Sequence, residues 1–244
     1  IPAFEEFVTK AQSEYSNQTS KGMFAPWILY KEDFQSIGGH DPLFAPFPYE
    51  DSDIFQRWIL AGYELIQSRD SFVYHLTCRG HRWNEQVQKD DDYYKIASNK
   101  AARNYLRKWG IWIENDSYQY PIITPKYDIE FRIFNSNPQL LKVLEPWCGR
   151  IYVDLYKDEV EKYIKEEQPN TLINLSNKIN QTANSDIVIR IDGSKFAQED
   201  FKLIQQLPKI IKDSGEVGKF TLGNLEITIN YLEEYQNSLI NVNR

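Results

Sequence analysis

Strand-like and helix-like segments alternate in the later part of the chain, and this alternation limits the folds that the chain can adopt. Three β-rich runs, RIYVDLY, NTLINL and DIVIRID, and a closing hairpin sequence, GKFTLGNLEITI, are interspersed with the helical segments DEVEKYIKEEQ and DFKLIQQLPKIIKDSG. Such alternation is typical of βαβ units, whose strands run parallel. We therefore predict an α/β protein in which residues 138–244 form a small domain with a mostly parallel sheet and a terminal helix over NYLEEYQNSLI.

Residues 1–137 have a different pattern and are predicted to form a separate part. Apolar residues at helical spacing predict a helix over residues 3–15, and the runs MFAPWILY and FVYHL are typical of short strands. Adjacent glycines and three prolines in KEDFQSIGGHDPLFAPFPYE predict a shaped loop. Asp51 or Ser52 is a candidate N-cap of the next helix, and Gly62 is expected to end it. The segment up to residue 137 is expected to be irregular covering structure.

The composition excludes several classes of protein. A chain of 244 residues with 41% hydrophobic content can bury one large core or two modest ones. The net charge of −7 argues against nucleic acid as a partner. Two cysteines, Cys78 and Cys148, are too few for a disulfide framework and suggest a reducing compartment. No run reaches the roughly 18 to 20 apolar residues of a membrane span, so we expect a cytoplasmic or virion-associated protein. Because the chain opens with IPAFEEF and not with Met, we expect a piece of a longer protein.

Three carboxylates, Glu50, Asp51 and Asp53, lie within four positions at the start of a predicted helix. Acidic residues at a helix N-terminus are stabilised by the unpaired amides and by the helix dipole, by a few tenths to about 1 kcal/mol each. Alternatively, one of them is an ionised base that takes a proton from a hydroxyl nucleophile. The spacing alone leaves both interpretations open.

The order of motifs around these carboxylates resembles a known enzyme family. The chain presents a turn Ile37-Gly38-Gly39, Asp41, an aromatic and proline-rich loop, Glu50-Asp51-Ser52-Asp53, a helix with Arg57, the turn Ala61-Gly62-Tyr63, a strand-like run and His75. Over residues 22–83, this order is similar to the C-terminal half of the catalytic domain of family 2 glycosyltransferases of GT-A fold. The resemblance implies that residues 1–137 are a truncated GT-A-like acceptor half, followed by the small α/β domain.

The resemblance also implies roles for individual residues. Asp51 would be the general base that deprotonates the acceptor hydroxyl, and Glu50 would orient the acceptor or support the base. Asp53 and Arg57 are expected near the substrate, paired with each other on the helix. His75 would be a ligand of Mn²⁺ or Mg²⁺ on the nucleotide diphosphate, a role that suits imidazole. A histidine satisfied at a strand end is the alternative.

Aromatic and basic residues complete the expected substrate site. Trp27 and Tyr49 are candidates for a floor on which a sugar stacks, although aromatic residues at this density are often core. Arg79 and Arg82, in CRGHRW, are candidates for contacts with diphosphate oxygens. A solvated basic loop is the alternative.

The resemblance implies a nucleotide-sugar donor and a glycan or other hydroxyl acceptor as substrates. Upstream of Met23 there is room for one helix only, so the donor-binding half is expected to be missing or supplied elsewhere. The strand-like run that ends at Asp192 is expected to be an ordinary central strand; a permuted metal-binding strand is the alternative. Two other functions remain open: a non-catalytic module that binds glycan or docks a partner, and a structural protein whose carboxylates only cap a helix.

Overall fold

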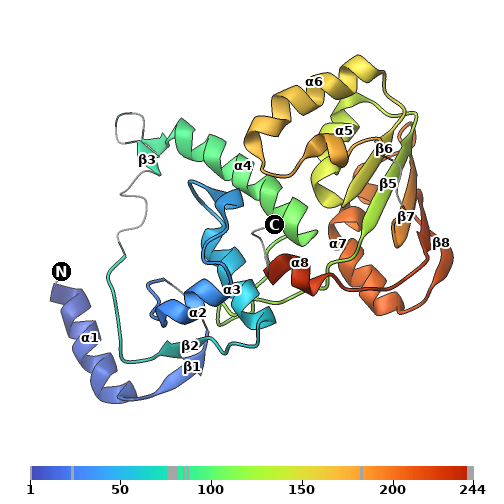
Figure 1. Cartoon of the computed structure of the whole chain (residues 1–244). Helices are drawn as coiled ribbons and strands as arrows, with labels where there is room; N and C mark the ends of the chain where they lie inside the picture. The colour runs from blue at the N-terminus through green and yellow to red at the C-terminus, as the bar shows by residue number, and fades with distance from the viewer. Residues whose placement is uncertain are drawn as a thin grey trace.

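The computed structural model describes residues 2–22, 25–75, 82–84, 86, 88–181 and 184–240. Its elements form an N-terminal group of helices and short strands and a C-terminal α/β unit, with α4 (Asp92–Trp109) lying between them (Figure 1). The chain is therefore a mixed α/β protein, as predicted. Within the described parts of the chain, no helix combines the length and the apolar character that crossing a bilayer requires.

A five-stranded sheet forms the C-terminal unit. Its strands lie in the order β6 (Arg150–Val153), β5 (Ile129–Phe134), β7 (Ile187–Asp192), β9 (Leu225–Ile229) and β8 (Gly218–Leu222). The strands β6, β5 and β7 are mutually parallel, whereas β9 is antiparallel to both β7 and β8. Four of the five strands therefore point the same way, which confirms the mostly parallel sheet.

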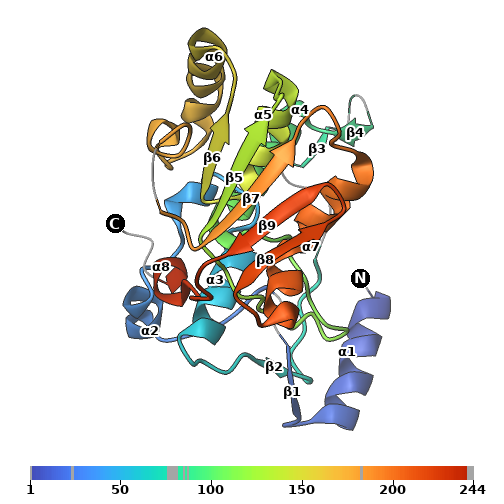
Figure 2. The ribbon, with the colours of Figure 1, turned by 90° about the vertical axis from the view of Figure 1, so that its right-hand side faces the viewer.

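Helices cover one face of this sheet. The helices α5 (Pro138–Leu144), α6 (Lys157–Glu167) and α7 (Gln198–Ser214) contribute to the main hydrophobic core, together with the inward-facing residues of the strands. Along β5, Phe131 and Ile133 are fully buried in that core, whereas the alternate residue Arg132 is partly exposed. In Figure 2, the other face of the sheet is turned toward the viewer, and no described helix covers it there.

Two parts of the predicted pattern in this unit were wrong. The run NTLINL is not a strand but contains only the last residue of η3 (Gln168–Asn170) and the first residue of η4 (Leu175–Asn177). The reason is local, because the Gln168 side-chain amide donates to the carbonyls of Thr171 and Ile173 and its oxygen accepts from the Leu175 amide. Conversely, β5 lies in the segment that was expected to be irregular. The sheet therefore spans the predicted boundary at residues 137 and 138, since β5 precedes it and pairs with strands that follow it.

The N-terminal group is built mainly from helices. It contains α1 (Pro2–Tyr15), β1 (Thr19–Lys21), α2 (Lys31–Ser36), η1 (Pro42–Phe44), α3 (Glu50–Leu60), β2 (Ile66–Ser68), β3 (Trp83–Asn84) and β4 (Lys89–Asp90). The helix predicted over residues 3–15 is confirmed as α1. The strands predicted in MFAPWILY and FVYHL are absent from the described residues of these runs; the strand found nearby is β2, which pairs with β1.

The ends of α3 only partly follow the prediction. Gly62 ends the helix as expected, with a φ of +87° and an amide that donates to the Ile59 carbonyl. The start was wrong, because the helix begins at Glu50 and its N-cap position is Tyr49, not Asp51 or Ser52. The carboxylates at the start of α3 are therefore inside the helix.

A second core lies around α4 and receives the C-terminus of the chain. Leu43, Ala101, Tyr105 and Trp109 are buried there together with Leu239 of α8 (Gln236–Ile240). Figure 1 shows α8 close to α3, although the two helices are far apart in the sequence. The last described helix thus returns to the N-terminal group.

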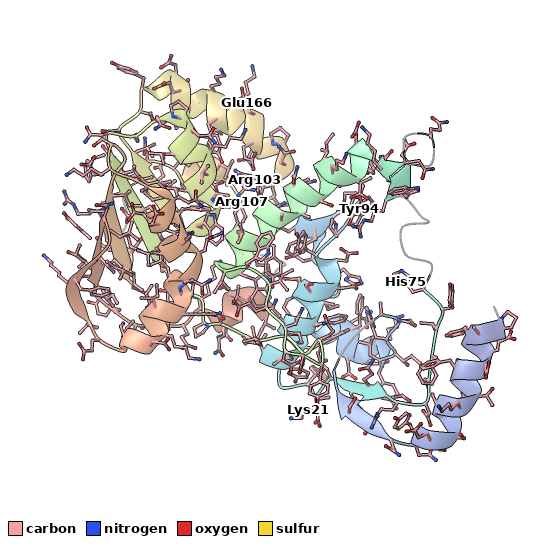
Figure 3. All side chains as sticks on the ribbon, turned by 180° about the vertical axis from the view of Figure 1, so that it is seen from behind. Lys21, His75, Tyr94, Arg103, Arg107 and Glu166 are labelled. Atoms are coloured by element: carbon pink, nitrogen blue, oxygen red, sulfur yellow. The ribbon has the colours of Figure 1, made fainter. Side chains whose placement is uncertain are left out.

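Buried charges connect α4 to the C-terminal unit. Glu145, in η2 (Glu145–Trp147), has no exposed side-chain surface and pairs with Arg107 at 2.6 Å and with Lys178 at 2.7 Å. Tyr163 donates to the same carboxylate at 2.9 Å. Arg107 and Arg103 both pair with Glu167, and both arginines lie on the side of α4 that faces this unit (Figure 3).

The contacts of Glu145 determine its ionisation. Burial alone would raise the pKa of this carboxyl, but Lys178 and Arg107 overcome that effect and hold its pKa well below the usual range. A depressed carboxyl pKa stabilises the fold above the pKa of the unfolded chain, about 4.3 for Glu. That stabilisation is lost as the pH falls below this value, because the unfolded state then binds more protons than the native state.

We expect Glu145→Gln to lower the free energy of unfolding at pH 7 by about 3 kcal/mol, because Arg107 and Lys178 lose a buried partner. The decline in stability between pH 5 and pH 2 is also expected to be shallower than in the wild type. Urea unfolding at several pH values measures both effects. Glu226→Gln, which changes an exposed carboxylate, is the control; equal behaviour of the two variants would contradict the prediction.

Candidate functional site

Asp53 lies at the centre of a fully buried polar network. One of its oxygens accepts from Arg57 Nε at 2.7 Å, one turn further along α3. The other oxygen pairs with Lys108 Nζ at 2.6 Å and accepts from Trp109 Nε1 at 3.0 Å, both at the end of α4. The side chains of Asp53 and Arg57 have no exposed surface. The predicted pairing of Asp53 and Arg57 is present. Both residues hold α3 in place, and neither lines the cavity described below.

The same network holds the Gly-Gly turn in place. Arg57 donates to the carbonyls of Ile37 at 2.7 Å and Gly39 at 2.6 Å. Gly39 has a φ of +66°, and a Cβ on it would lie 2.9 Å from the ring of Phe34. Lys108 also pairs with Asp41 at 2.9 Å. The Gly-Gly turn, Asp41 and α3 are therefore joined to one another by buried hydrogen bonds and ion pairs.

A cavity of about 700 Å³ opens beside this unit. Glu50 and Asp51 contribute from the first turn of α3, and Tyr49 lies immediately before them. His75 comes from the extended segment after β2, and Tyr94 comes from the first turn of α4; both are labelled in Figure 3. The structure thus brings together four of the residues predicted for the site, Tyr49, Glu50, Asp51 and His75.

Tyr49 has an unusual backbone conformation at the edge of this cavity. Its φ is +84°, in the left-handed region that residues other than glycine rarely adopt. Its ring contacts the rings of Tyr105 and Trp112, with centroids 5.7 and 5.9 Å away, and burial raises the pKa of its hydroxyl. These packing contacts hold the residue in this conformation, where it turns the chain from the proline-rich loop into α3.

The other predicted residues lie elsewhere. Trp27 lines a neighbouring cavity of about 530 Å³. Arg82 pairs with Asp90 at 3.4 Å, and its guanidinium lies 5.3 Å from the ring centroid of Tyr94; it is not among the residues that line either cavity. Arg79 lies outside the described residues.

Several residues of the site were not predicted. The walls of the larger cavity include Tyr94, Ser98, Asn115 and Gln119, and the support beneath it includes Lys108 and Trp109. These residues come from segments that only the fold brings next to α3. The sequence carried one usable signal, a lysine and a tryptophan immediately before the helix-ending Gly110, but nothing in it indicated the partner of either residue.

The fit of a divalent cation depends on the donors near His75. An imidazole is a suitable ligand for Mn²⁺, and the carboxylates of Glu50 and Asp51 line the same cavity. In the described parts of the chain, however, no three His, Cys, Asp or Glu side chains come together as a metal-binding group. The described side chains alone therefore do not form a complete metal site.

The comparison with known families agrees with the resemblance at a coarse level. Residues 7–81, less than half of the chain, match the family model of the N-terminal domain of galactosyltransferase. This segment includes the Gly-Gly turn, the whole of α3 and His75. The match supports a glycosyltransferase family and a glycosyltransferase-like function; it does not support family 2 or a C-terminal placement. No curated protein and no solved structure matches the chain.

We expect Asp53→Asn to lower the free energy of unfolding by about 3 kcal/mol, because Arg57 and Lys108 remain buried without a full counter-charge. Asp51→Asn is the matched control, since it makes the same chemical change two residues away in the same helix. It is expected to cost less than about 1 kcal/mol. Urea unfolding measures both values, and an equal loss in the two variants would show that Asp53 is not the structural carboxylate.

Proposed function

We propose that the chain is the catalytic part of a glycosyltransferase that transfers a sugar from a nucleotide-sugar donor to a hydroxyl acceptor. The observation that carries this proposal is the presence of Glu50, Asp51 and His75 in one cavity, within the segment that matches the galactosyltransferase family model. The volume of about 700 Å³ lies in the range of small-molecule sites.

Asp51 is the general base in this proposal. It is partly exposed at the cavity wall, whereas Asp53 is neutralised beneath it. As the acceptor oxygen attacks the anomeric carbon, its proton passes to Asp51. The bond between that carbon and the diphosphate oxygen breaks at the same time, and the nucleoside diphosphate leaves. Glu50, the adjacent residue on the same wall, orients the acceptor hydroxyl toward Asp51.

The rigid support beneath α3 matters for this reaction. Asp51 lies in the first turn of a helix whose buried charged residues, Asp53 and Arg57, are bonded to α4 and to the Gly-Gly turn. Its position is therefore set before substrate binds. Such positioning of a reacting group accounts for a large part of enzymatic rate acceleration.

We expect Asp51→Asn to lower kcat by about 10² to 10⁴-fold, the usual contribution of a general base, with little change in stability. Release of UDP from UDP-galactose in the presence of sugar acceptors is the measurement, because the matched family is described by galactose transfer. Asp92→Asn, at the exposed start of α4, is the control. If Asp51→Asn turns over at the wild-type rate, Asp51 is excluded as the general base. If the wild type binds glycan but transfers no sugar, a binding module is favoured.

We also propose that His75 supplies one ligand to Mn²⁺ or Mg²⁺ when a nucleoside diphosphate is bound. His75→Ala is then expected to weaken Mn²⁺-dependent binding of UDP by about tenfold or more. Isothermal titration with and without Mn²⁺ measures this change. His40→Ala, which removes an imidazole that lines neither cavity, is the control. Equal affinity of the His75→Ala variant and the wild type would exclude His75 as a ligand.

A further inference from the structure

The cavity that contains Asp51 adjoins the smaller cavity that contains Trp27. The two share Ala25, Pro26 and Val73 as lining residues, so they are adjacent, and together they are called the trough. The described residues of the smaller cavity belong to the segments 22–33 and 63–73, with Trp58 of α3. A molecule bound at Asp51 that extends past these shared residues would reach the smaller cavity.

One face of α3 lines both cavities. Asp51 and Phe55 contribute to the larger cavity, and Trp58 contributes to the smaller one. These residues are four and three positions apart, so they follow one another along the same face of the helix. At a rise of 1.5 Å per residue, the seven steps from Asp51 to Trp58 span about 10 Å. This distance exceeds the width of a single sugar ring.

The smaller cavity has the chemistry of a site for a neutral polyhydroxylated molecule. Trp27 is half-buried and supplies aromatic surface, and its ring packs against that of the buried Trp58, with the ring planes at 84° and the centroids 5.1 Å apart. Such rings pack well against the apolar C–H faces of sugars. Tyr63 donates to Asp33 at 3.0 Å, which fixes this carboxylate in the wall as an acceptor for hydroxyl groups. Gln67 and Ser68 add further polar groups.

The charges of the smaller cavity exclude it as a diphosphate site. Among the described residues that line it, the charged ones are Asp33 and Glu64, and none is a lysine, arginine or histidine. A diphosphate or an acidic sugar would meet only carboxylates there, and like charges repel. The smaller cavity therefore suits the acceptor side of the reaction and not the nucleotide.

From the trough, its length and its charge, we infer that the acceptor is an uncharged oligosaccharide of at least two sugar units. Its reacting hydroxyl lies at Asp51, and its remote units bind in the cavity of Trp27 and Trp58. This inference rests on the proposed function and adds to it the class of acceptor. Binding energy from the remote units would then position the reacting hydroxyl.

The test is binding of fluorescently tagged, uncharged oligosaccharides of one to four glucose, galactose or N-acetylglucosamine units, followed by fluorescence polarisation. We expect the longer members to bind about tenfold or more tightly than the matching monosaccharide. This preference should disappear in Trp27→Ala and persist in Trp27→Phe, which keeps an aromatic ring. Tyr152→Ala, which removes an exposed ring from the sheet, should leave the preference unchanged. Thermal unfolding of each variant establishes that it is folded.

Three results would overturn the inference. They are equal affinity for short and long members, a length preference that Trp27→Ala does not change, and tighter binding of UDP or of acidic oligosaccharides that is lost in Trp27→Ala. None of these depends on turnover, so they are distinct from failure of the proposed function. If sugar transfer is lost in Asp51→Asn and no length preference is found, the proposed function stands and only the extended acceptor is overturned.

Discussion

The structure depends on two neighbouring cations at the end of α4. Lys108 pairs with Asp41 and Asp53 of the N-terminal group, and Arg107 pairs with Glu145 of the C-terminal unit. Adjacent helical residues point about 100° apart, so the two side chains reach partners on different sides of α4. A buried ion pair adds little net stability, but a buried charge without its partner costs several kcal/mol. The network therefore disfavours arrangements that separate α4 from either neighbour.

This network separates the roles of the carboxylates at the start of α3. Residues two apart in a helix point about 200° apart, so Asp51 and Asp53 face opposite directions. Asp53 is buried against Lys108, and Asp51 lines the cavity. Asp53 is therefore the structural carboxylate of the cluster, and Asp51 is the one that the proposed function assigns to the reaction. Glu50, next to Asp51, lines the same cavity.

The sequence predicted the local patterns and missed the contacts between distant segments. The α/β class, the mostly parallel sheet and the end of α3 at Gly62 follow from periodicity and from glycine conformation, which act over a few residues. The prediction of irregular structure up to residue 137 misses β5, although apolar and charged residues alternate along most of this strand. The reason is that the aromatic and proline-rich residues before it are typical of irregular structure. Lys108 could not be assigned a partner, since Asp41 is 67 residues away. No pattern within one segment indicates such a contact.

The helix α3 carries cavity-lining residues on one face and buried ion pairs on another. Asp51, Phe55 and Trp58 line the trough, while Asp53 and Arg57 are bonded to α4 and to the Gly-Gly turn. A rotation or shift of the helix would move both cavities together, because a helix moves as a rigid body. Displacement of a reacting group by about 1 Å can lower a rate about 100-fold. The buried Asp53 and Arg57 therefore hold Asp51 in position, and under the proposed function they would affect catalysis through that position alone.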